Sequence, residues 1–421
     1  MSLQGPLILV ADAPATDLVE ALGAAGAFPI IESKWADAAT AFSSVKPSGV
    51  VIAEAAAAPN EAAAHTLAKK IATASGPMIP VVARFRGADD ATFPIALAVD
   101  AGLPVARLIA RLQSALRVRA LHATVLRRIE TFAAQDGHVP QLPVGDALDD
   151  ATVLIAGRGP LYPRLSVAMG ERVPVIGALS VEGAAKHLNT RDVDGVVIGD
   201  GFSPRMVEAF LTVLAQEPRF RDVPIAVIDD PAPDFVEVLP NIDHVDGDPA
   251  RLVTRMLPLV RMHAFEARLK RMLTSLDADG AVDPETGLLR RDTFWQELGD
   301  AAAEASERSL ALSVARLSFD AALDARAGKD AGRLLTRLIR NIDFACRDDD
   351  GALMIAFTQT DLRGAHVIAR RIAGALKNTL LAPTGAHSKA AATLTLATLS
   401  AGDTLDSLML RVMGGAMVAA E

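Results

Sequence analysis

The chain has one cysteine, one tyrosine and two tryptophans among its 421 residues, and these shortages exclude several kinds of protein. A lone cysteine, Cys346, cannot form an intramolecular disulfide, which favours a reducing compartment. Aromatic residues make up only 4% of the chain, so its cores must be built mainly from Ala, Val, Leu and Ile. It has no apolar run of about 18 residues and no signal-peptide pattern at its start, so we expect a cytoplasmic protein without a membrane span.

Basic residues are outnumbered by acidic ones, and the formal net charge is −9. A non-specific nucleic-acid binder needs a basic face, so this balance disfavours nucleic acid as a partner. The eight histidines and the single cysteine form no H-x₃-H or C-x₂-C array, and we therefore predict no metal site. The length fits two or three domains of roughly 100–150 residues each.

Short apolar strands alternate with helical segments twice in succession. The expected strands are 7–10, 49–53 and 79–83, and then 153–156, 195–199 and 223–228. This alternation is typical of a parallel sheet covered by helices on both faces. Each set ends in a long helical pattern, at about Val105 to Phe132 and about Pro249 to Leu276. We therefore predict an α/β protein with two tandem doubly wound domains.

The predicted domain bounds follow from these patterns and from the breaks between them. The first domain covers 1–132, and the second, with its long terminal helix, covers 151–276. A segment rich in Gly, Pro and Asp, 133–150, reads as a linker. A third α/β domain covers 277–421, with strands expected near 311–317, 353–357 and 391–396.

Residues at the strand ends of the first two domains resemble response-regulator receiver domains, which have a flavodoxin-like fold. A working receiver holds Mg²⁺ with an acidic pair and transfers a phosphoryl group to an Asp, with Ser/Thr and Lys nearby. In the first domain these positions read Ala11-Asp12, Glu54, Phe85 and Leu103. Glu54 resembles the charge of a phosphorylated Asp, so a permanently active state and a decayed site both stay open.

The second domain keeps an aspartate at the acceptor position, Asp200, with Pro204 four residues later. Ala156-Gly157 replaces the acidic pair, and Asp229 and Asp248 replace the Ser/Thr and the Lys. Without metal carboxylates, phosphoryl transfer to Asp200 would be slow. Asp200 is therefore only a candidate phosphoacceptor, and we expect both receiver-like domains to serve homodimerisation and partner docking.

The third domain opens with Asp283-Pro284-Glu285-Thr286-Gly287-Leu288-Leu289-Arg290-Arg291, which resembles the D-x-L-T-G-L-x-N-R opening of GGDEF domains. That resemblance implies a nucleotide-cyclase palm fold, whose active members join two GTP molecules with the help of two Mg²⁺. Here Arg316 stands in place of the strand Asp, and Asp349-Asp350-Gly351-Ala352-Leu353 in place of the GGDEF hairpin. The segment from Asp320 to Ala331 also lacks the Asn and Asp that read guanine. The resemblance implies a degenerate cyclase with no catalytic residues, which is not an enzyme.

The inhibitory site of the same family has the core R-x-x-D, and Arg340-Asn341-Ile342-Asp343 matches it at the family's spacing from the hairpin. Arg371 matches the further arginine of that site. R-x-x-D alone is weak evidence for such a site, because the motif recurs elsewhere in the chain. The spacing from the hairpin is what distinguishes this copy. Arginine can fork onto guanine O6 and N7, and a carboxylate can accept from guanine N1–H and N2–H. We expect Arg340 and Asp343 to face the same way on one helical turn.

The layout as a whole resembles PleD-type response regulators, and the lost hairpin beside a kept inhibitory site resembles their PopA-like relatives in alphaproteobacteria. This implies a cyclic di-GMP receptor and scaffold in cell-cycle or polar signalling, with no further cofactor and with protein partners at a cell pole or among proteolytic adaptors. Two alternatives stay open: a residual diguanylate cyclase and a nucleotide-independent dimeric scaffold. Arginines from the second domain could complete the site, and no motif selects among Arg158, Arg164, Arg172, Arg255 and Arg261.

Overall fold

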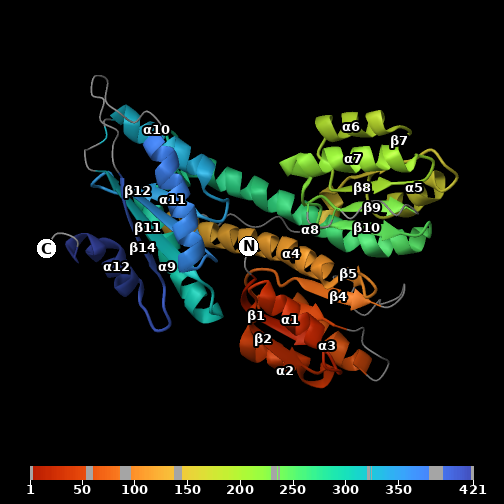
Figure 1. The fold of residues 1–421 in the computed structure, drawn as a ribbon, viewed down its shortest axis with the longest axis horizontal. Helices are drawn as coiled ribbons and strands as arrows, with labels where there is room; N and C mark the ends of the chain where they lie inside the picture. Colours follow the sequence, from red (N-terminus) through yellow and green to blue (C-terminus); the bar gives the residue numbers. More distant parts are fainter. Residues whose placement is uncertain are drawn as a thin grey trace. The chain divides into compact units, whose positions relative to one another are not determined.

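The computed structural model describes residues 3–53, 60–85, 96–136, 145–228, 238–319, 325–378 and 392–418, together with residues 235 and 323. It divides into two compact units (Figure 1). The first unit contains residues 1–122 and 143–270, and the second contains 123–142 and 271–421. The sequence predicts three domains, and that further division remains a prediction.

The first sheet is parallel and has the strand order β2-β1-β3-β4-β5, the doubly wound order of flavodoxin-like folds. Its elements are β1 (Gln4–Val10), α1 (Thr16–Ala24), β2 (Phe28–Ser33), α2 (Trp35–Val45), β3 (Gly49–Ile52), α3 (Glu61–Ala72), β4 (Val81–Phe85), β5 (Leu97–Asp100) and α4 (Val105–Asp136). The four residues of β3, Gly-Val-Val-Ile, are all buried, as expected for a strand with helices on both faces.

The second sheet repeats that order as β10-β9-β8-β6-β7. Its elements are β6 (Val153–Ala156), α5 (Tyr162–Gly170), β7 (Val175–Ala178), α6 (Val181–Thr190), β8 (Gly195–Ile198), α7 (Pro204–Gln216), β9 (Ile225–Ile228), β10 (Ile242–Val245) and α8 (Pro249–Leu276). Local chemistry fixes the helix starts. The Ser180 hydroxyl accepts a hydrogen bond from the Gly183 N–H at 3.0 Å, and Pro204 occupies the first turn of α7.

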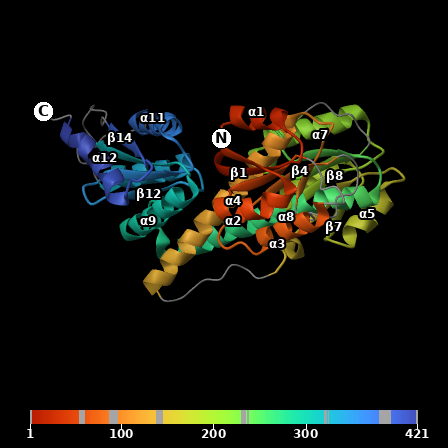
Figure 2. The same cartoon turned by 90° about the horizontal axis from the view of Figure 1, so that it is seen from below.

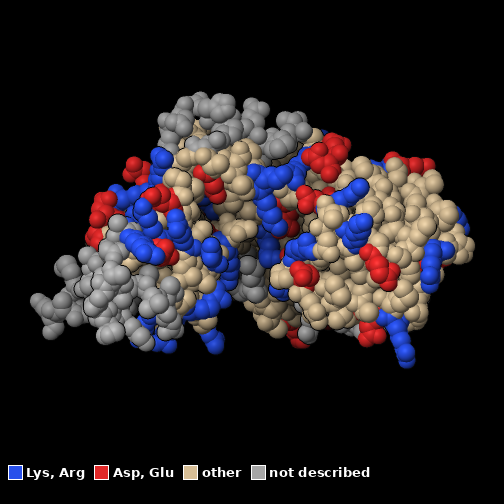
Figure 3. All heavy atoms as spheres, turned by 90° about the horizontal axis from the view of Figure 1, so that it is seen from above, with Lys and Arg blue, Asp and Glu red and all other residues tan. Residues whose placement is uncertain are grey.

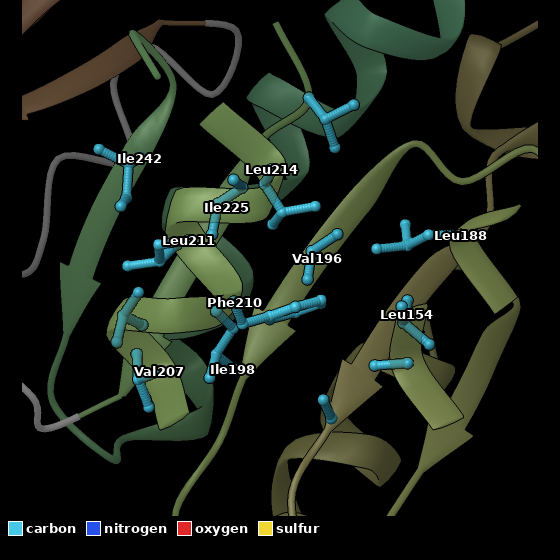
Figure 4. Packing of buried hydrophobic residues seen from close by; sticks show 14 of the residues in the cluster. Leu154, Leu188, Val196, Ile198, Val207, Phe210, Leu211, Leu214, Ile225 and Ile242 are labelled. Carbon is cyan, nitrogen blue, oxygen red and sulfur yellow. The ribbon is translucent and has the colours of Figure 1, made fainter. Parts of the chain in front are cut away.

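Helices cover both faces of the second sheet, which makes it doubly wound. Leu154, Val196 and Ile198 pack with Phe210 and Leu214 of α7 on one face (Figure 4). On the other face, α5 and α8 bury another cluster. The predicted α/β architecture with parallel sheets is confirmed by the strand order of both sheets and by the layers of the second.

The two sheets of the first unit are joined by a buried polar network between α4 and β10. Arg107 donates from Nη1 to the Ile242 carbonyl oxygen at 2.6 Å, and Arg111 donates to the same oxygen from Nη2 at 3.2 Å. Arg111 Nη1 also lies 3.3 Å from Asp243 Oδ2. The side chain of Arg111 is fully enclosed, so its charge depends on these partners.

The third sheet has the order β12-β13-β11-β14 and is antiparallel at every pairing. Its elements are α9 (Arg291–Arg308), β11 (Leu312–Phe319), α10 (Ala325–Leu338), β12 (Phe344–Arg347), β13 (Leu353–Thr358), α11 (Leu362–Asn378), β14 (Ala392–Thr398) and α12 (Leu405–Val418). The β-α-β-β-α-β succession is the split βαβ arrangement. Figure 2 shows α9 and α11 on opposite sides of this sheet.

Long helices link the parts of the chain. The predicted helices near 105–132 and 249–276 correspond to α4 and α8, and α8 continues through Pro258. α8 ends in a short π-helical turn, Asp277–Ala281, in which Gly280 has a φ of 111°. This left-handed residue stops the helix where the sequence predicted a break. The predicted linker, 133–150, falls partly outside the described residues.

The described helices include none with the length and apolar character that a bilayer crossing requires. Acidic and basic side chains are interspersed over the face seen in Figure 3. Within the described parts of the chain, no three His, Cys, Asp or Glu side chains gather closely enough to hold a metal ion. Cys346 is buried, as a small core residue would be.

Candidate functional site

The predicted phosphoacceptor, Asp200, is hydrogen-bonded to the backbone of the loop that follows β6. The Asp200 carboxylate accepts a hydrogen bond from the Leu161 N–H at 3.1 Å, and the Asp200 carbonyl accepts from Arg158 and Gly159. Gly159 lies so close that a Cβ there would fall 2.1 Å from Asp200 Oδ2. β6 ends in Ala156-Gly157 at this edge and supplies no carboxylate. Asp200 therefore acts here as an anchor for the 157–161 loop.

The other predicted receiver positions are only partly described. Asp12 accepts hydrogen bonds from the Trp35 N–H, at 3.3 Å, and from the Asn60 side chain. Asp248 accepts from the Ala250 N–H at 3.1 Å and so caps the start of α8. Glu54, Asp229 and the side chain of Phe85 lie outside the described residues. Asp12 and Asp248 thus both have structural partners.

Asp200→Asn should leave the stability of the first unit nearly unchanged, because an amide oxygen can still accept from the Leu161 N–H. Asp200→Ala should lower the free energy of unfolding by about 1–2 kcal/mol, because the loop loses that acceptor. Urea denaturation of the two variants measures the difference. Equal loss in both would mean that the negative charge, and not the hydrogen bond, holds the loop.

The hairpin between β12 and β13 forms an ion pair with the neighbouring strand β11. Arg316 lies in the middle of β11, and its Nη2 donates to Asp350 Oδ2. The Ala352 N–H and the Arg316 guanidinium together hold the pKa of Asp350 below its ordinary value. The sequence alone does not indicate that Arg316 and Asp350 pair. An arginine within the otherwise apolar run of β11 was the available signal.

The other two acids of the hairpin, Asp348 and Asp349, share one arginine as their partner. Arg291, at the start of α9, places Nε 2.8 Å from Asp348 Oδ1 and 3.3 Å from Asp349 Oδ2. Gly351 has a φ of 86°, and its N–H donates to the Asp348 carbonyl, which closes a tight turn. A left-handed position favours glycine, so the turn itself explains why Gly351 stands there. The acids of the hairpin thus pair with arginines of α9 and β11.

The motif at the opening of the third domain forms a turn. Asp283 Oδ2 accepts from the Thr286 hydroxyl at 2.7 Å, and Gly287 has a φ of 71°. Lys329 of α10 lies 2.6 Å from Glu285, which ties the turn to that helix. Leu289 pairs with Cys346 of β12. The motif therefore anchors the segment before α9 to the third sheet.

The predicted inhibitory-site pair lies in a turn and not on a helix. α10 ends at Leu338, and the Asp343 N–H donates to the Arg340 carbonyl at 3.0 Å. The expectation of a helical turn is wrong, because the chain must reverse here to start β12 at Phe344. The turn nevertheless brings the two residues together. Arg371 is exposed on α11, and its convergence with Arg340 and Asp343 stays a prediction.

Asp343 is the unusual member of this set, because it is only 6% exposed. Its Oδ1 accepts from the Thr358 N–H at 3.2 Å, while Oδ2 is enclosed and has no hydrogen-bond partner among the described residues. Burial raises the pKa of Asp343 to about 7, although the nearby Arg340 charge opposes the rise. A buried carboxyl oxygen without a donor is costly and suits a site that receives a donor from a ligand.

Three of the arginines considered as completing this site have other partners in the first unit. Arg158 donates from Nε to the Gly201 carbonyl at 2.8 Å. Arg255 lies 3.9 Å from Asp100, and Arg261 Nε lies 2.9 Å from Asp146. These contacts occupy part of each guanidinium.

Solved structures similar to part of this chain are GGDEF domains. The coiled coil and GGDEF domain of DgcB from Caulobacter crescentus, in complex with c-di-GMP, is 20% identical, with a TM-score of 0.31; the match covers 37% of this chain and 87% of that one. The FimX GGDEF domain from Pseudomonas aeruginosa is also 20% identical, with a TM-score of 0.30 and coverage of 33% and 93%. No family model and no curated protein matches the chain.

Proposed function

We propose that this chain is a non-catalytic cyclic di-GMP receptor that acts as a scaffold in bacterial signalling. The observation that carries the proposal is the Arg340–Asp343 turn, whose enclosed carboxyl oxygen has no donor within the described part of the chain. Guanine offers two donors, N1–H and N2–H, on the edge that a carboxylate recognises. The guanidinium of Arg340 can meet a phosphate or the guanine O6 and N7.

The charge of the ligand agrees with the surroundings of this turn. Cyclic di-GMP is a dianion, and α10 and α11 both carry exposed arginines, among them Arg337 and Arg371. Asp343 Oδ2 is enclosed, so a guanine can reach it only after neighbouring side chains open. Binding would therefore favour an altered arrangement of this face, which is how a ligand shifts a population towards a signalling state.

The hairpin chemistry supports a role without cyclase activity. Turnover needs two Mg²⁺ held by carboxylates, and here Arg316 occupies one carboxylate position and Gly351 the other. Asp350 is paired with Arg316, and Asp348 and Asp349 with Arg291, so these acids are not arranged for a metal. The triphosphate would also meet two carboxylates in place of glycines.

The rest of the proposal follows the resemblance of the whole chain to response regulators. The two doubly wound sheets are proposed as receiver-like modules that no longer transfer phosphate and that serve homodimerisation and docking. Protein partners at a cell pole or among proteolytic adaptors, in a cytoplasmic setting, belong to the same proposal. Nothing in it requires a further cofactor.

Calorimetric titration of the full chain with cyclic di-GMP tests the receptor role. We expect micromolar or tighter binding, and Arg340→Ala should weaken it about 100-fold, because a charge-assisted contact of roughly 3 kcal/mol is lost. Arg337→Ala is the matched control, since it removes one exposed positive charge from the same region without touching the turn. An affinity equal in both variants would remove the site assignment, and no binding at all would favour the nucleotide-independent scaffold.

Incubation with GTP and Mg²⁺ tests the absence of catalysis. We expect no cyclic di-GMP above background by chromatography, because neither of the two metal-binding positions holds a carboxylate. An active diguanylate cyclase assayed in parallel provides the control. Clear product formation would overturn the interpretation of Arg316 and Gly351 and favour the residual cyclase.

A further inference from the structure

Arg128 joins three segments inside the second unit. It lies in the last part of α4 and is only 4% exposed. Its Nε donates to Oε1 of Glu297, in the middle of α9, and its Nη1 donates to Oδ1 of Asp277, the first residue after α8. One guanidinium therefore ties the ends of α4 and α8 to the first helix of the third domain.

This arrangement is electrostatically costly. Glu297 is fully buried, and its Oε2 has no hydrogen-bond partner among the described residues. Burial raises the pKa of Glu297 and also that of Asp277, against the attraction of Arg128. Buried ion pairs of this kind are often no more stabilising than apolar residues of the same volume. Stability alone therefore does not account for Arg128, whereas a fixed arrangement of the three segments does.

The contacts of Arg127 show that the packing of α4 on α9 can be separated from the link to the end of α8. Arg127, one residue earlier, places Nη1 2.8 Å from Glu304 of α9, and this pair joins α4 to α9 without including Asp277. Apolar side chains of α4, Val125, Ile129 and Phe132, are also buried. α4 thus has other means of packing in the second unit. What Arg128 adds is the bond to the end of α8.

We propose that Arg128 is a positioning residue that couples the ends of α4 and α8 to α9, so that a change in either helix is transmitted to the third domain. The two helices are the ones that follow the last strands, β5 and β10, of the two doubly wound sheets. A signal received by either sheet therefore has a continuous helix leading to the same guanidinium. The proposal is independent of nucleotide binding.

Hydrogen–deuterium exchange on the full chain tests the coupling in the double variant Arg128→Met/Glu297→Met. This variant removes the guanidinium and the fully buried carboxylate together and leaves Asp277, whose side chain is 34% exposed. We expect its melting temperature to match or exceed that of the wild type, while amides of residues 277–281 exchange about tenfold faster. Arg127→Met/Glu304→Met is the matched control and should leave residues 277–281 unchanged. The same rate for residues 277–281 in wild type and in Arg128→Met/Glu297→Met would overturn the proposal.

A second arm separates coupling from a merely structural role. Asp243→Asn weakens the buried partner of Arg107 and Arg111 in the first half of α4. In an otherwise wild-type chain it should speed exchange in α9, and in the Arg128→Met/Glu297→Met background that effect should disappear. An equal response of α9 in both backgrounds would show that Arg128 transmits nothing.

Discussion

Asp343→Asn should stabilise the folded protein at pH 8 and abolish cyclic di-GMP binding. In the native state the pKa of Asp343 is about 7, against an ordinary value of 3.8. The native protein therefore keeps a proton that the unfolded chain loses between these values, and stability falls as the pH rises from about 4 to about 7. Asparagine carries no such charge. The gain should be near zero at pH 4 and as much as about 4 kcal/mol at pH 8.

The geometry allows this substitution. An amide oxygen can replace Oδ1 and still accept from the Thr358 N–H, while the enclosed Oδ2 becomes an uncharged NH₂ group. Urea denaturation at several pH values measures the stability difference. Asp361→Asn, at an exposed carboxylate that accepts from the Gly364 N–H, is the control and should show no comparable gain at high pH. A stability difference that does not grow with pH would contradict the assigned titration.

The affinity for cyclic di-GMP should rise with pH, whereas the stability of the wild type falls. Only ionised Asp343 can accept from both guanine donors, so wild-type affinity should rise up to about tenfold per pH unit below pH 7 and level off above it. Asp343→Asn should lose this dependence together with the affinity, because its NH₂ group faces the guanine donors. Calorimetry across the same pH range decides the matter. If wild-type binding did not depend on pH, the ligand would not be hydrogen-bonded to Asp343.

Asp243→Ala should cost about 3–5 kcal/mol of the stability of the first unit. Asp243 is 3% exposed and lies beside Arg111, whose charge is fully enclosed. Removing the carboxylate leaves buried positive charge without its ion partner, which is far more costly than losing a surface pair. The loss should appear as a lower urea midpoint for the transition of residues 1–122 and 143–270.

Asp246→Ala is the matched control for this experiment. It lies one residue after β10 and pairs with Arg251 at 2.7 Å, but 53% of its side chain is exposed. Solvent screens such a pair, so its removal should cost less than about 1 kcal/mol. Similar losses in the two variants would mean that burial of the α4–β10 network contributes little.

Much of the fold could be predicted because buried strands are short, wholly apolar and repeated. β3, Gly-Val-Val-Ile, and β8, Gly-Val-Val-Ile, have the same sequence and the same central place in their sheets. Such periodicity reports burial directly, so the layer order followed from the sequence. The prediction that Arg340 and Asp343 lie on a helical turn was wrong, because spacing alone cannot distinguish a last helical turn from a chain reversal before a strand.

By itself, the sequence determined which chemical groups are present: the apolar strands, the R-x-x-D motif, and Arg316 and Gly351 at the positions predicted to correspond to metal carboxylates. Only the tertiary structure decided which charges meet. It paired Arg316 with Asp350, enclosed Asp343 and placed Arg128 between Glu297 and Asp277. The physical reason is that ion pairing and desolvation depend on distance and burial. Residues far apart in the sequence, such as Arg128 and Glu297, acquire both only when the chain folds.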